Sequence, residues 1–228
     1  MQSLSLLDIA AAVWFTCVWF GQGWVTEKSP WSGRSVNHFI NEARRHWVRQ
    51  AAGRELRMVD TGIIAGLQNG TAFFASTSLI AIGGGFTLLN SADHAVGVVS
   101  AISLFTETDR ALFEYKVIGL LGMYAYAFFK FGWAYRMFNF ASILIGALPP
   151  PSFVGTPEME KAIARATAIA IAAGTNFNRG LRAFFMSIGF LGCFLGPWAL
   201  IASSTFIGLI LLRRQFTSDS ARIMRENS

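Results

Sequence analysis

The residues of this sequence most capable of chemistry are two cations and a set of polar side chains within apolar segments. Lys130 and Arg136 lie in the segment Phe128–Arg136, and charges at membrane depth are costly and often functional. The polar set lies in one stretch and comprises Gln68, Asn69, Thr71, Ser76 and Ser78. In hydrocarbon such groups bond to neighbouring helices or face water in a cavity. The pattern predicts interhelical hydrogen bonds or, with the two cations, a polar path that selects anions.

The depth of the two cations has two interpretations. If Arg136 marks the membrane boundary, Lys130 lies about 9 Å deeper and its ammonium can reach the interface. Trp133 between them suits an interfacial aromatic belt. If the span is instead centred between residues 124 and 146, both cations are buried and need acidic partners, of which Asp60 is nearest in depth. We favour the first interpretation.

Residues that often serve as metal ligands or acid–base catalysts do not occur in suitable patterns. The histidines, His38, His46 and His94, include no pair at the i, i+4 spacing of two ligands on one helix face. Glu107 and Asp109 lie in a short acidic loop, where solvation is the ordinary explanation. The sequence therefore predicts no enzyme activity, no metal and no cofactor.

Four apolar stretches must position these residues. They cover approximately residues 5–25, 63–89, 117–136 (extending towards 148) and 183–212. Each is long enough for the roughly 20 helical residues that cross a bilayer. With 53% hydrophobic and 14% charged residues and a mean hydropathy of +0.44, the composition excludes a soluble protein. We predict an all-α polytopic membrane helical bundle, one domain over residues 1–228, with about four transmembrane helices.

The last stretch, 183–212, is about 45 Å long as a straight helix, which exceeds a core of about 30 Å. Gly196 and Pro197 lie at its middle. It is either one tilted, proline-kinked span or a re-entrant hairpin that returns the tail to its original side. We prefer the kinked span, because re-entrant backbone in lipid is unfavourable unless protein covers it.

Two amphipathic surface helices are expected, at residues 36–59 and 158–173. The first is rich in arginine. Its Arg44, Arg45 and Arg49 are expected to contact anionic lipid headgroups. A nucleic-acid site is the less favoured explanation of the same charges, so no nucleic acid is expected as a partner.

The distribution of charge predicts orientation. Basic residues predominate between the first and second stretches, whereas the connection between the second and third contains Asp93, Asp109 and Glu114. The positive-inside rule then places the basic connection in the cytoplasm and the amino terminus in the periplasm of an inner membrane. Arg213 and Arg214 break the rule, because four crossings leave the tail outside.

The second stretch carries Gly62, Gly66 and Gly70 at every fourth position. This spacing places the glycines on one helix face, where another backbone can approach closely. The pattern predicts a contact with another transmembrane helix.

Several segments together resemble a known family. They are residues 41–47, residues 57–60 with 73–78, residues 138–147, and residues 176–185 with Pro197 and Trp198. In these segments the chain resembles the bacterial and plant membrane family called domain of unknown function 599, from about the first span to Arg214. The resemblance implies a multi-pass fold and no particular activity, cofactor or site residue.

We therefore expect a non-enzymatic, multi-pass inner-membrane protein. The favoured role is an oligomerising scaffold or an accessory subunit of a larger membrane complex. Its partners would be membrane lipids and other transmembrane helices, from a second copy or another subunit. The alternative is an ion channel or small-solute transporter with a polar path along the second span.

Overall fold

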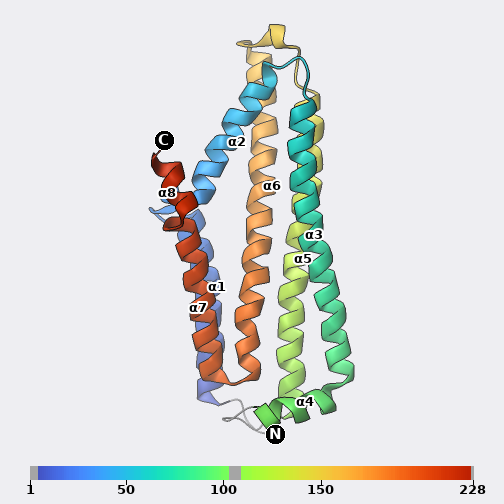
Figure 1. The fold of residues 1–228 in the computed structure, drawn as a ribbon, viewed down its shortest axis with the longest axis vertical. Coiled ribbons are helices and arrows are strands. Elements are labelled where there is room, and N and C mark those ends of the chain that lie inside the picture. The colour runs from blue at the N-terminus through green and yellow to red at the C-terminus, as the bar shows by residue number, and fades with distance from the viewer. Residues whose placement is uncertain (1–4, 103–108, 227–228) are drawn as a thin grey trace.

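The computed structural model describes residues 5–102 and 109–226, and within these ranges all regular elements are helical (Figure 1). The predicted all-α class is confirmed, and Glu107 lies outside the described residues. The α-helices are α1 (Leu6–Glu27), α2 (Val36–Ala52), α3 (Met58–Asn90), α4 (Ala92–Ile102), α5 (Arg110–Gly146), α6 (Pro157–Phe190), α7 (Pro197–Phe216) and α8 (Asp219–Glu226). Short 3-10 turns are formed by η1 (Ser32–Arg34), η2 (Pro151–Phe153) and η3 (Leu191–Phe194).

Four helices in the described ranges are long and apolar enough to cross a membrane. They are Leu6–Glu27, Met58–Asn90, Arg110–Gly146 and Pro197–Met224. The long helices α3, α5 and α6 have 33, 37 and 34 residues. At about 1.5 Å per residue each is about 50 Å or longer, well beyond a hydrocarbon core of about 30 Å. These three helices therefore extend through two regions of the molecule, one of about membrane thickness and one beyond it.

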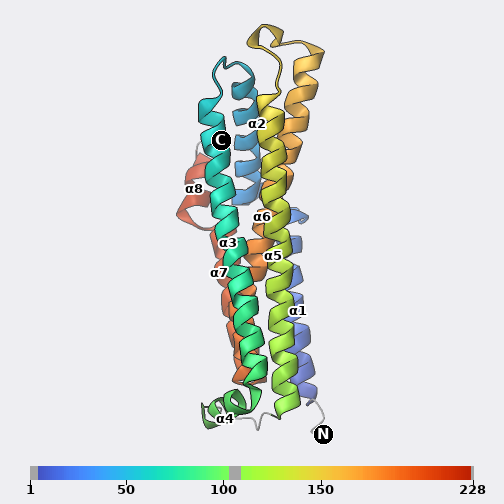
Figure 2. The same cartoon turned by 90° about the vertical axis from the view of Figure 1, so that its right-hand side faces the viewer.

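We call these regions the basal part and the apical part. In the basal part, α1 and α7 pack against each other and against the lower half of α6, at the level of the lower halves of α3 and α5 (Figures 1 and 2). In the apical part, α2 packs against the upper end of α6 (Figure 1). The carboxyl-terminal α8 lies beside α2, near the junction of the two parts.

The helices begin at residues that satisfy free backbone amides. Ser5, Ser35 and Thr156 accept hydrogen bonds from the backbone N–H groups of Asp8, His38 and Met159. These hydroxyls cap α1, α2 and α6, because the first amides of a helix have no partner within it. Pro157 occupies the first turn of α6, where a missing N–H costs nothing.

The prediction of a single kinked span over 183–212 is wrong. Residues 183–190 end α6, and α7 begins at Pro197 and runs back along α6 (Figure 1). Gly196 has a φ of 131°, a conformation that favours glycine. At Gly189, an added Cβ would lie 3.3 Å from the Ser204 Cα, so the two backbones approach closely. Gly196 and Pro197 therefore mark a turn and a helix start rather than a kink.

The two predicted surface helices are also corrected. Residues 158–173 are the first half of the continuous helix α6, and the helix predicted over 36–59 ends at Ala52. The apolar face of α2 enters a protein core rather than a lipid surface. Its Val48 is fully buried in a cluster with Phe138 of α5 and Met159 of α6. Burial of such side chains is the main favourable term in folding, at about 1.5–3 kcal/mol each.

Arg57 fixes the apical ends of two helices. Its guanidinium donates to the carbonyl oxygens of Ala51 at 3.2 Å, Leu148 at 2.9 Å and Pro149 at 2.9 Å. Helix carboxyl ends carry unpaired carbonyls and partial negative charge. One cation therefore stabilises the ends of α2 and α5 together.

Asp60 is bound by Trp47 and Arg54, and not by Lys130 as the second interpretation of the cations required. Its carboxylate is fully buried and accepts from Trp47 Nε1 at 2.7 Å and from Arg54 at 2.6 Å. Lys130 instead lies 3.5 Å from Asn176 Oδ1 and over the ring of Tyr126. A pairing of Lys130 with Asp60 is therefore excluded.

Candidate functional site

A layer of polar side chains crosses the bundle where the basal and apical parts meet. Glu27, the last residue of α1, binds Arg179 at 2.6 Å and also binds Arg182, both on α6. Asn37 Oδ1, at the start of α2, accepts from Asn178 at 2.9 Å and from Gln215 of α7 at 3.4 Å. These bonds hold the ends of α1, α2 and α7 against the middle of α6.

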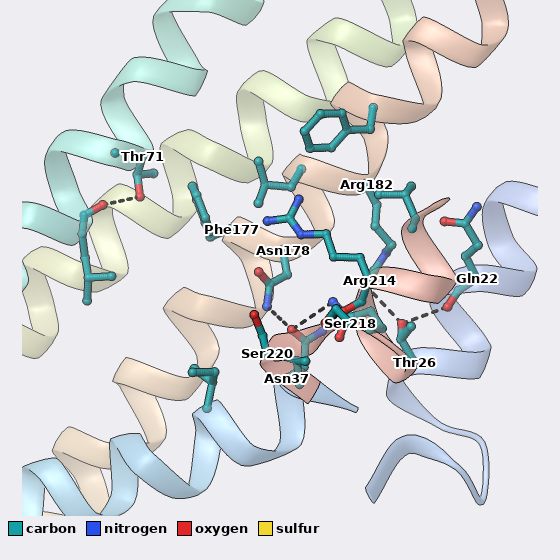
Figure 3. Close-up of a pocket in the computed structure, with 18 of the residues that line it drawn as sticks. Gln22, Thr26, Asn37, Thr71, Phe177, Asn178, Arg182, Arg214, Ser218 and Ser220 are labelled. Atoms are coloured by element: carbon teal, nitrogen blue, oxygen red, sulfur yellow. Dashed lines mark hydrogen bonds between the residues drawn. The ribbon is translucent and has the colours of Figure 1, made fainter. Parts of the chain in front are cut away.

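A cavity of about 400 Å³ lies at this level. Its walls come from six helices and from the start of α8 (Figure 3). The polar lining residues are Gln22, Thr26, Asn37, Arg44, Thr71, Asn178, Arg182, Arg214, Gln215, Ser218 and Ser220. The apolar lining residues are Val36, Ile40, Gly66, Leu67, Gly70, Phe138, Phe177, Leu181, Phe185, Leu211 and Leu212. The volume falls within the range of about 300–1,000 Å³ typical of small-molecule sites.

The lining is strongly cationic. Arg44, Arg182 and Arg214 line the cavity. None of the described residues that line it is acidic. Arg44 and Arg214 form no ion pair with any described residue, and Arg182 shares Glu27 with Arg179. Arg44 and Arg214 each contribute one uncompensated positive charge. Arg179 and Arg182 share the single negative charge of Glu27, which leaves one more. The site therefore has an excess of three positive charges. In Figure 3 the polar groups gather around Arg182 and Arg214, away from Thr71 on α3.

Arg44 is directed inward by a missing side chain on α6. Its guanidinium packs against Gly174, where an added Cβ would overlap it, and it donates to Asn41 Oδ1 at 2.8 Å. Burial lowers the pKa of the Arg44 guanidinium below its ordinary value, because the charged form is partly desolvated there. A bound anion would compensate for this cost.

Gln22 supplies a polar group without a protein partner. The side chain is 3% exposed, and its Nε2 lies 3.5 Å from the Met186 sulfur. Its Oε1 is buried and accepts no hydrogen bond from the described residues. A buried unsatisfied polar atom costs about 1–3 kcal/mol, and this oxygen has almost no accessible surface, so it does not face the open space of the cavity.

The seven residues predicted for a polar path lie in separate surroundings. Thr71 lines the cavity, but its hydroxyl bonds to the carbonyl of Leu67, one turn earlier in its own helix. Ser78 bonds in the same way to the Phe74 carbonyl. The other residues of α3, Gln68, Asn69 and Ser76, do not line this cavity. Lys130 contacts Asn176, as described above, and Arg136 is exposed over the ring of Phe140.

The arginines predicted to contact lipid headgroups also separate. Arg44 lines the cavity, Arg45 pairs with Glu42, and Arg49 pairs with Glu160 of α6 at 3.1 Å. Both pairs are exposed, and exposed pairs contribute little stability. Contact of Arg45 or Arg49 with lipid stays a prediction.

The three predicted packing glycines are exposed and face open space. A Cβ added at Gly62, Gly66 or Gly70 would meet no described atom within 4 Å. They therefore pack against no other described helix of this chain. Gly66 and Gly70 instead line the cavity, where the lack of side chains leaves it wide.

Sequence reasoning missed most of the cavity residues. Gln22 lies within an apolar stretch and resembles any tolerated polar residue there. Asn178 and Arg182 fall within the segment 176–185, and the charge of Arg182 indicates only the cytoplasmic side of the chain, not a binding site. Arg214 carried a usable signal, since its charge lies on the wrong side of the membrane in a four-span arrangement.

This arrangement is suited to binding an oxyanion that carries an apolar portion. Arginine and amide groups provide charge-assisted hydrogen bonds to phosphate or carboxylate oxygens, and the aromatic and aliphatic walls accept hydrocarbon. Among residues 5–102 and 109–226, no group of three or more His, Cys, Asp and Glu side chains could hold a metal ion.

Comparison with known proteins places the chain in a family. The sequence model of the family described as protein of unknown function, DUF599, matches residues 10–220. The chain therefore belongs to this family, as its resemblance in the segments noted above implied. No curated protein and no solved structure matched the chain.

Proposed function

We propose that this protein is a multi-pass inner-membrane protein that binds an amphipathic anion in the cavity, and that it has a binding role rather than an enzymatic one. The observation that carries the proposal is the cationic lining. Three arginines face a partly apolar space, and no described acidic residue lines it.

The charge distribution supports an orientation. Arg213 and Arg214 end α7 on the side of the basal part where α2 begins, because Gln215 bonds to Asn37. The positive-inside rule then favours the apical part in the cytoplasm and the amino terminus in the periplasm. In this orientation the cavity lies near the headgroups of the cytoplasmic leaflet.

A thermal-shift measurement with octyl phosphate tests the proposal on the full chain in a mild detergent. A ligand that binds the folded state raises the melting temperature by mass action. We expect octyl phosphate to stabilise the wild-type protein and octanol, which has the same chain without the anion, to have no comparable effect. Arg214→Gln should lose the response, whereas Arg213→Gln should keep it, because both arginines are exposed but only Arg214 lines the cavity. Equal responses to both compounds, or in both variants, would contradict the proposal.

A scaffold role is the second candidate, and the exposed glycine face of α3 favours it. Gly62 lies on this face but not in the cavity, so Gly62→Leu separates assembly from ligand binding. Under the scaffold role, this variant should lose a homo-oligomer or a co-purifying subunit during gentle extraction. Gly132→Leu on α5 is the matched control, because Gly132 is also exposed and also faces open space. An unchanged native mass for Gly62→Leu would exclude this face as the contact.

The channel alternative has less support. Two of its predicted pore-lining hydroxyls, Thr71 and Ser78, bond to the backbone of their own helix. Such bonds satisfy a hydroxyl in hydrocarbon without water or a partner helix.

A further inference from the structure

We propose that the ligand is an anionic phospholipid of the surrounding bilayer, which reaches the cavity sideways between α3 and α7. Its phosphate would lie among Arg44, Arg182 and Arg214, and its acyl chains would leave past Gly66 and Gly70. This inference rests on the proposed function and adds the class and the source of the ligand.

The cavity is divided by polarity as a lipid headgroup region requires. Arg214, Asn37 and the hydroxyls of Ser218 and Ser220 lie together on the side of α2 and α8 (Figure 3). Phe138, on the other hand, brings an apolar ring from α5. A molecule with an anionic head and a hydrocarbon continuation matches both surfaces.

The size of the cavity requires the hydrocarbon portion to leave it. A space of about 400 Å³ holds a glycerophosphate headgroup and the start of the chains, but not a complete diacyl lipid. Long acyl chains must therefore extend into the surrounding hydrocarbon. A soluble ligand would need no such exit.

An exit of the right kind lies between two membrane-crossing candidates. Gly66 and Gly70 of α3, and Leu211 and Leu212 of α7, line the cavity, and both helices are apolar enough to cross a membrane. The two glycines are exposed and leave open space where side chains would stand. Figure 1 shows α6 between α7 and α3, and Phe177 and Leu181 of α6 line the same cavity.

The charge of the site selects among phospholipids. A zwitterionic headgroup brings an ammonium group, and no described acidic residue lines the cavity to receive it. An excess of three positive charges instead favours a headgroup with net negative charge, such as phosphatidylglycerol, over phosphatidylethanolamine.

The experiment uses the full chain reconstituted into nanodiscs with equal amounts of phosphatidylglycerol and phosphatidylethanolamine. Lipids that remain bound after release into detergent are identified by native mass spectrometry. We expect the wild-type protein to retain phosphatidylglycerol preferentially. Arg44→Gln and Arg214→Gln should each lower this retention about tenfold, the effect of losing one strong charge-assisted contact. Arg213→Gln should retain the lipid as the wild type does.

A second variant tests the sideways route without removing charge. Gly66→Leu fills the opening with a side chain that meets no other described atom at its Cβ. It should lose phosphatidylglycerol while it keeps the thermal response to octyl phosphate, whose short chain fits inside the cavity.

The outcomes separate this inference from the proposed function. Octyl phosphate binding without preferential retention of phosphatidylglycerol would overturn the lipid assignment and leave an anion site. Equal retention by Arg213→Gln and Arg214→Gln would also overturn it, because the lipid would then be bound elsewhere on the surface. If neither probe binds, both proposals fail.

Discussion

Gly180, near the candidate site, is predicted to be constrained by the buried ring of Phe131. A Cβ added there would lie 2.7, 2.8 and 3.0 Å from three ring carbons of Phe131. Phe131 is fully buried, stacked on Phe74 with ring centroids 5.5 Å apart and tilted against Phe177 at 5.7 Å. Because the ring is enclosed, it has little space to move away. Gly180→Ala should therefore strain the contact between α5 and α6.

The size of this effect is best measured as a coupling energy. Overpacking a close-packed core typically costs about 1–3 kcal/mol, whereas Gly→Ala inside a helix gains about 1 kcal/mol of helix propensity. The gain is the same in any background, but the clash depends on the Phe131 ring. In a Phe131→Leu background, Gly180→Ala should thus be less destabilising by about 2 kcal/mol.

The assay is reversible unfolding in mixed micelles, titrated with a denaturing detergent for the wild type, both single variants and the double variant. Gly132→Ala is the matched control, because that glycine faces open space and lacks the clash. Additive effects of Gly180→Ala and Phe131→Leu, within about 0.5 kcal/mol, would refute the reasoning.

Three further outcomes are expected. Arg57→Ala should lower the free energy of unfolding by about 2–3 kcal/mol through loss of its carbonyl contacts, with Arg57→Lys intermediate; equal stability of the alanine variant would show that the carbonyls find water instead. Gly192→Val should disrupt the α6–α7 turn and lower the yield of folded protein, because its Cβ would lie 2.9 Å from the Ala199 carbonyl carbon; a normally folded variant would contradict this tight packing. Single cysteines at the exposed residues Arg222 and Asp93, in a chain without its native cysteines, should be labelled from opposite sides of the membrane; labelling from the same side would exclude the α6–α7 hairpin.

The lipid-facing helices could be predicted from sequence because hydropathy measures exposure to hydrocarbon. The stretches 5–25 and 63–89 match α1 and α3 closely, and 117–136 is the central part of α5. The helix α5 continues beyond this stretch to Gly146. In each case the helix presents enough of its own surface to lipid for its composition to reveal it.

Glycine spacing was a poor guide to contacts within the chain. Gly62 and its two neighbours at four-residue spacing face open space, whereas Gly180 and Gly174 receive a ring and a guanidinium from neighbouring helices. Small residues such as Ala173, Ala183 and Ser187 share the buried face of Gly180, but the polar residues interspersed among them hide the pattern. The partner, Phe131, is 49 positions away, and local spacing cannot reveal a contact decided by tertiary packing.

Tertiary packing also explains why hydropathy does not predict α6 as a crossing, and why Arg213 and Arg214 break the positive-inside rule in a four-span arrangement. No residue between 169 and 187 is exposed, because α1, α5 and α7 all pack against this helix. A helix covered by protein needs no apolar surface, and Arg182 is tolerated there because Glu27 of α1 neutralises it. Hydropathy therefore counts the helices that lipid touches, not the helices that cross. When α6 is counted as a crossing, the number becomes odd, and Arg213 and Arg214 return to the side of the basic helix α2, as the positive-inside rule favours.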